Sequence, residues 1–135
     1  RRMGGKNVRG NGCSMLDEDV LIDMNEHFFE MTPRMDIHPA RIDTLLVTHP
    51  HRDHFTPMLL SQRAMPAECV GMTIEQMQAY ISPSFTWLPM LHVYGNRFVE
   101  EAIRAVPGLM ENAERCRFTF HRLEAGTEMQ IKENV

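Results

Sequence analysis

The sequence predicts an α/β fold (α+β in some classification schemes), in which short apolar strands alternate with helices. Two stretches carry this prediction. Residues 44–48 form an apolar run that ends in a polar loop, and the apolar run 91–95 is followed at 97–106 by apolar residues at helical spacing. Pro107 and Gly108 then mark the end of that helix. Strands that alternate with helices are typical of α/β folds.

The residues before this first apolar run predict a hairpin and a short connection. Strands are expected at 7–16 and 19–24, joined by a turn at 16–19. A loop or short helix follows. Its apolar side would be formed by Phe28, Phe29, Met31 and Met35. Residues 37–43 then lead into the strand at 44–48.

Two further helices and a strand are expected later in the chain. Pro57 at the first helical position sacrifices no hydrogen bond, so a helix should run from there to about residue 63. Residues 73–80 open with the Thr-x-x-Gln pattern of a capping box and continue in helical register. The alternating residues 118–121 predict a strand.

Residues 65–89 form a segment whose role the pattern leaves open. Because the segment follows a polar loop rich in histidine, it could form a lid over a site there, with Phe85, Trp87 and Met90 as candidate substrate-facing groups. The alternative that we favour is a small satellite core beneath a long loop.

Composition limits the class of protein. A chain of 135 residues suits one domain or part of one, and a net charge of −4 argues against general affinity for nucleic acid or membranes. No apolar stretch approaches the roughly 20 residues of a membrane helix, and the first residues lack the apolar core of a signal peptide, so a cytoplasmic location is expected. Cys13, Cys69 and Cys116 are widely spaced, so no disulfide is expected.

Three histidines and an aspartate are concentrated between His49 and His54, directly behind the apolar run that ends at Thr48. In an extended segment residues i and i+2 point the same way, so His49 and His51 could bind one ion. A sharp turn after His51 would direct Asp53 and His54 toward a second ion. Two ions about 3.5–4 Å apart can share a water and stabilise both oxygens of a displacement, so the pattern indicates hydrolysis.

This segment contains the complete pattern Thr-His-x-His-x-Asp-His, which resembles the signature motif of the metallo-β-lactamase superfamily and is formed by Thr48, His49, His51, Asp53 and His54. The resemblance implies the first half of a four-layer αββα sandwich, with residues 1–135 as a partial domain. It further implies that His49 and His51 ligate a first metal and that Asp53 and His54 ligate a second. Asp53 would also act catalytically by orienting the bridging water.

Residues 20–23 resemble an earlier strand of the same family, which ends in an aspartate. The resemblance implies that Asp23, together with Thr48, supports the metal loop, residues 48–54, without binding metal. Outer partners of this kind fix the orientation of ligating imidazoles.

The family pattern also implies a downstream histidine, a bridging aspartate and a last histidine. After His54 the remaining histidines are His92 and His121, and neither fits a later motif, so both are expected to be structural. The chain therefore reads as a fragment, with the later ligands expected beyond residue 135.

We interpret the chain as part of a metal-dependent hydrolase in which a metal-bound hydroxide attacks a phosphodiester bond. The order of strand, Tyr94-Gly95 and helix resembles ribonuclease Z-like and cyclic phosphodiesterase members, which favours phosphodiesters. Two divalent metal ions are implied, with zinc preferred and manganese or iron compatible. The expected partner is a small-molecule or phosphodiester substrate, with a homodimer as a further option.

Two alternatives stay open, and a third is disfavoured. The chain could hydrolyse other ester or amide bonds, since this fold serves many substrates. It could also be a non-catalytic metal-binding or scaffold module. A di-iron redox branch of the superfamily typically carries glutamate at the position of His51, so the imidazole there argues against redox chemistry.

Overall fold

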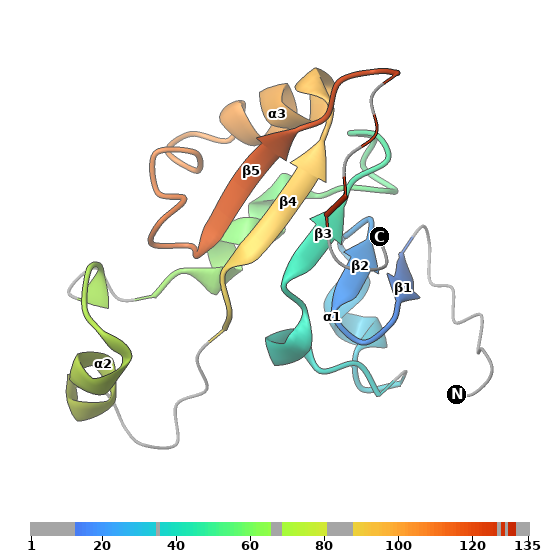
Figure 1. Ribbon diagram of the computed structural model, residues 1–135. Coiled ribbons are helices and arrows are strands. Elements are labelled where there is room, and N and C mark those ends of the chain that lie inside the picture. Colours follow the sequence, from blue (N-terminus) through green and yellow to red (C-terminus); the bar gives the residue numbers. More distant parts are fainter. Residues whose placement is uncertain are drawn as a thin grey trace.

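The protein forms one five-stranded sheet in a computed structural model that describes residues 13–34, 36–65, 69–80, 88–126, 128, 130 and 131 (Figure 1). The strands lie side by side in chain order and are β1 (Ser14–Leu16), β2 (Val20–Ile22), β3 (Thr44–Leu46), β4 (Leu91–Gly95) and β5 (Phe118–Arg122). The pair β1–β2 is antiparallel, and the other three neighbouring pairs are parallel.

Short helical segments connect the strands. They are α1 (Phe28–Met31), η1 (Pro39–Arg41), η2 (Pro57–Arg63), α2 (Ile74–Tyr80) and α3 (Arg97–Arg104). The mixed α/β class predicted from the sequence is confirmed. No helix in the described ranges is both long and apolar enough to cross a membrane.

The predicted strands are present, with shorter bounds in the first half of the chain. The hairpin pairs Ser14 with Ile22 and Leu16 with Val20, while residues 7–12 of the predicted first strand lie outside the described residues. Met24 lies beyond β2 and forms an isolated parallel bridge with Phe55. The predicted strand 44–48 forms ladder pairs only at Thr44–Leu46.

The predicted helices follow their local signals. The Thr73 hydroxyl accepts from the Gln76 N–H at 3.2 Å, and the Gln76 side chain accepts from the Thr73 N–H at 2.9 Å, which completes the capping box before α2. The side chain of Asn96 caps α3, whose predicted end at residue 106 is corrected to Arg104.

The helix predicted to start at Pro57 has the expected position but is a 3-10 helix. The Leu59 N–H donates to the Thr56 carbonyl at 3.0 Å, and the Ala64 N–H donates to the Ser61 carbonyl at 3.1 Å, each three residues earlier. These contacts span three residues, as in the tighter 3-10 geometry.

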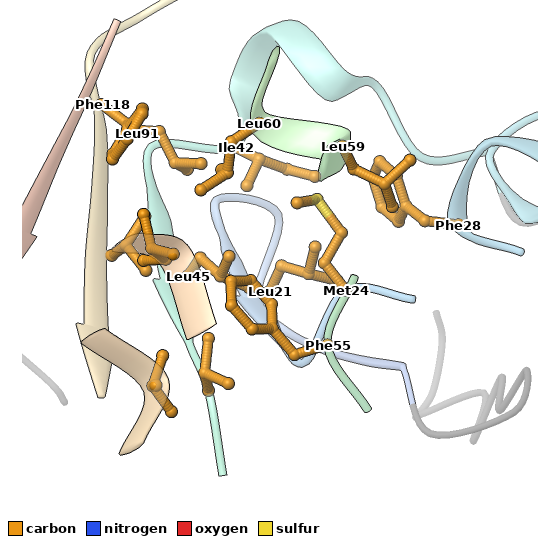
Figure 2. Close-up of a cluster of buried hydrophobic side chains, with 14 of the residues drawn as sticks. Leu21, Met24, Phe28, Ile42, Leu45, Phe55, Leu59, Leu60, Leu91 and Phe118 are labelled. Atoms are coloured by element: carbon orange, nitrogen blue, oxygen red, sulfur yellow. The ribbon is translucent and has the colours of Figure 1, made fainter. Parts of the chain in front are cut away.

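The main core lies between one face of the sheet and the helices α1, η2 and α3. Figure 2 shows Leu21 and Leu45 of the sheet directed toward Leu59 and Leu60 of η2 and Phe28 of α1. On α3, the inward side chains are Val99 and Ile103, which are fully buried. Apolar burial of this kind is the dominant stabilising contribution to folding.

The expectation that Phe29 belongs to the apolar side of α1 is wrong. Phe28 is buried, but Phe29 is 42% exposed. Adjacent residues of a helix point about 100° apart, and a four-residue helix presents only one side to the core. Met31 and Met35 have side chains outside the described set.

The opposite face of the sheet carries a pair of histidines on the neighbouring strands β4 and β5. His92 Nδ1 lies 2.9 Å from His121 Nε2, and the Tyr94 ring stacks on His121 with centroids 4.6 Å apart. Burial lowers the pKa of His121, and the nearby His92 lowers it further.

The described part of the segment 65–89 contains a small core of its own. Met65, Cys69 and Met77 are buried together, and Figure 1 shows α2 set apart from the sheet. This cluster agrees with the satellite-core alternative. Of the three candidate substrate-facing groups, Phe85 and Trp87 lie outside the described residues, and Met90 is half-buried. A lid formed by residues 65–89 therefore stays a prediction.

Truncation of Leu60 should destabilise the protein strongly, because its side chain is fully buried under the sheet. We expect Leu60→Ala to lower the free energy of unfolding by about 2–5 kcal/mol in urea titrations. Met58 lies on the same 3-10 helix but is 61% exposed, so Met58→Ala should change stability by no more than about 0.5 kcal/mol. Equal losses in the two variants would contradict the described packing.

The histidine pair should make stability depend on pH. Because the pKa of His121 in the folded protein lies below its ordinary value of 6.5, the unfolded chain binds more protons as the pH falls below 6.5. The stabilisation is complete above that pH and is lost toward the folded-state pKa. We expect His121→Gln to flatten the decline in unfolding free energy between about pH 7 and about pH 5. His38→Gln, at an exposed position, should keep the original slope.

Candidate metal centre

The histidine-rich loop leaves the sheet at the carboxyl end of β3. The strands β2 and β3 are parallel, so their carboxyl ends meet at the same edge, where ligand sites of α/β sheets form. The predicted turn after His51 is present, since the N–H groups of His54 and Phe55 both donate to the His51 carbonyl at 2.8 Å. This turn brings the second half of the motif back toward its first histidine.

The turn gathers His49, Asp53 and His54 into one cluster. One ligand atom from each residue lies within 4.8 Å of the others. His54 Nε2 lies 3.5 Å from Asp53 Oδ2, and the rings of His49 and His54 have centroids 3.9 Å apart. Two imidazole nitrogens and a carboxylate oxygen are donors that zinc prefers, so the residues fit a divalent ion.

His51 lies beside this cluster. Its ring meets the ring of His49 edge-on, with centroids 4.8 Å apart, and its side chain is exposed. The sequence predicts that His49 and His51 share one ion and that Asp53 and His54 share another. In the structure the ligand atoms of His49 lie close to those of Asp53 and His54. The division into two metal sites stays a prediction.

Asp23 lies directly behind the loop and is 2% exposed. Its carboxylate accepts hydrogen bonds from the Thr48 N–H at 2.7 Å and the Thr48 hydroxyl at 2.7 Å, and lies 2.8 Å from His54 Nδ1. An ionised carboxylate can only accept, so the proton of His54 belongs on Nδ1 and Nε2 is left for a metal. These contacts are compatible with a supporting role for Asp23 and Thr48, which stays a prediction.

Asp23 also redirects the chain. Its φ of 61° lies in the left-handed region, which aspartate tolerates better than most residues. The residues that follow therefore run beneath the metal loop. The Met24 N–H donates to the His54 carbonyl at 2.9 Å, and the Met24 carbonyl accepts from the Thr56 N–H at 2.9 Å.

Two further contacts from this segment were not predicted from the sequence. The Asn25 side-chain amide donates to the Asp53 carbonyl at 2.9 Å, and Arg52 donates to Glu26 at 2.8 Å. The hydrogen bond and charge of Arg52 lower the pKa of Glu26. These contacts could have been suspected because Asn25 and Glu26 are polar residues that come just after a strand ending beside the metal motif.

The arrangement of strands and helices is that of part of a metallo-β-lactamase fold, which confirms the fold that the motif predicts. In particular, the structure is similar to a diphosphatase from the PhnP family, with a TM-score of 0.50 and 20% identity over 88% of this chain and 38% of that chain. A likeness to the short form of human tRNase Z (ELAC1) has a TM-score of 0.47 and 18% identity, over 82% of this chain and 37% of that chain.

The chain thus spans about two fifths of the length of these solved structures. No protein-family model matches the sequence, and no curated protein matches it either.

Replacement of Asp23 by asparagine should weaken metal binding. Asparagine also tolerates the left-handed backbone, but its amide cannot accept from all three donors that the carboxylate satisfies. We expect Asp23→Asn to reduce zinc affinity by about 10–100-fold in competition titrations.

Asp17 offers a matched control, because it has a φ of 60° and lies exposed in the hairpin turn. Asp17→Asn should bind zinc as the unchanged protein does. Equal affinities for both variants would show that Asp23 does not support the ligands.

Proposed function

We propose that the chain is part of a metal-dependent hydrolase that acts on phosphodiester bonds. The observation that carries this proposal is the cluster of His49, Asp53 and His54, with the buried Asp23 carboxylate hydrogen-bonded behind it. The likeness to a PhnP-family diphosphatase supports a hydrolase at the level of the family.

The proposed cofactor is a pair of divalent ions, with zinc first and manganese or iron as alternatives. His49 and His51 would hold one ion, and Asp53 and His54 the other. When bound, such ions lower the pKa of water and stabilise charge on the attacking and leaving oxygens. The nitrogen and oxygen donors of the cluster suit these metals.

The residues of the loop have separate tasks in this proposal. Asp23 holds the proton of His54 on Nδ1, so the imidazole keeps one orientation and one tautomer. Asp53 has a side chain that is 74% exposed, so its carboxylate can accept a hydrogen bond from water and orient that water toward a substrate. The half-buried His49 and His54 form the inner side of the site.

The proposal is tested with the full-length protein. Metal content is measured by mass spectrometry, and hydrolysis is measured with bis(p-nitrophenyl) phosphate. We expect about two ions per chain and turnover that falls at least about 100-fold in His51→Ala, since a direct ligand should matter at least as much as an outer partner. His38 is an exposed histidine outside the loop, so His38→Ala should keep both the bound ions and the turnover.

Two results would count against the proposal. Bound metal without turnover would exclude this phosphodiester and direct attention to other esters or amides. An absence of bound metal would overturn the hydrolase and favour a scaffold module with the same fold.

A further inference from the structure

Asn25 is a buried polar residue beside the candidate metal centre. It is 1% exposed, and its side-chain amide joins two segments that are 28 residues apart in the sequence. Buried amides cost free energy unless their hydrogen bonds are satisfied, so the contacts of this side chain define its role.

The two ends of the amide have different partners. Oδ1 accepts from the His27 N–H at 3.0 Å, which closes a local turn, and Nδ2 donates to the Asp53 carbonyl at 2.9 Å. A carbonyl can only accept and an N–H can only donate, so a flipped amide would lose both bonds. The orientation of Asn25 is therefore unique.

The bond to Asp53 holds a peptide plane that lies between two of the proposed ligands. The Asp53 carbonyl and the His54 N–H belong to the same planar peptide unit. Asn25 binds this unit at its carbonyl, and the His51 carbonyl binds it at the N–H, at 2.8 Å. Because the unit is planar and held at both ends, the directions in which the Asp53 and His54 side chains leave it are restricted.

We propose that Asn25 is a positioning residue for the metal centre, acting through the peptide unit between Asp53 and His54. Its side-chain amide acts through the backbone carbonyl of Asp53. Its hydrogen bond sets the angle at which a carboxylate and an imidazole are presented together. This inference rests on the metal site of the proposed function.

Two substitutions separate the tasks of the amide. Asn25→Asp keeps an acceptor for the His27 N–H but places an oxygen against the Asp53 carbonyl. Asn25→Ser is uncharged and keeps a short acceptor, but its hydroxyl is too short to reach that carbonyl. The matched control is Asn112→Asp, because Asn112 Nδ2 also donates to a backbone carbonyl, that of Gly108 at 2.8 Å, in an exposed turn outside the metal loop.

The measurement is Co²⁺ binding to the full-length protein, followed by competition titration and by the visible absorption spectrum of the bound ion. We expect both Asn25 variants to lose about 10–100-fold in affinity, as outer partners of metal ligands do, and to change the spectrum. Asn112→Asp should show the affinity and spectrum of the unchanged protein. Far-UV circular dichroism and the melting temperature report whether each variant is folded.

Folded Asn25 variants with unchanged Co²⁺ affinity and spectrum would overturn the inference. Loss of the folded state in both would also overturn it, because Asn25 would then support the fold rather than the loop. If the unchanged protein binds no Co²⁺, the proposed function fails first and this inference fails with it, which distinguishes the two failures.

Discussion

The metal loop depends on the burial of one carboxylate, that of Asp23. An ionised carboxylate that is 2% exposed is costly unless donors replace the lost water. Those donors come from the loop itself, namely the backbone and hydroxyl of Thr48 and the imidazole of His54. The burial of Asp23 and the conformation of the loop therefore require each other. Because His54 is at once a donor to this carboxylate and a proposed ligand, the support and the site form one unit.

The sheet explains why these groups meet. The parallel pairing of β2 and β3 ends at Ile22 and Leu46, so Asp23 and the loop leave the sheet side by side. The left-handed conformation of Asp23 then turns the chain beneath the loop. Each residue from 23 to 26 contacts the loop. Asp23 contacts Thr48 and His54, and Met24 contacts His54 and Thr56. Asn25 contacts Asp53, and Glu26 contacts Arg52. The residues at this one strand end thus contact three of the five motif residues, which are Thr48, Asp53 and His54.

Sequence reasoning succeeded where the signal is local and had less success where it depends on distant partners. Nearby residues specify three features that were predicted correctly, namely the capping box at Thr73, the strand that ends at Gly95 and the turn after His51. The 3-10 geometry of η2 and the exposure of Phe29 depend on how short helices meet the core, which residue type alone does not determine. The role of Asn25 was not predicted because it rests on a contact across 28 residues, and no spacing rule indicates which backbone carbonyl a lone amide will reach.

The cluster also links ion binding to the folding equilibrium. The folded chain holds His49, Asp53 and His54 together and orients the His54 imidazole against Asp23, so an ion held by the cluster binds the folded chain more tightly than the extended one. Mass action then adds up to about 2.7 kcal/mol to stability when the free ion is at 100 times its dissociation constant for the folded chain. Chelation would remove the same amount. The melting temperature of the protein therefore becomes a gauge of site occupancy that requires no knowledge of the substrate.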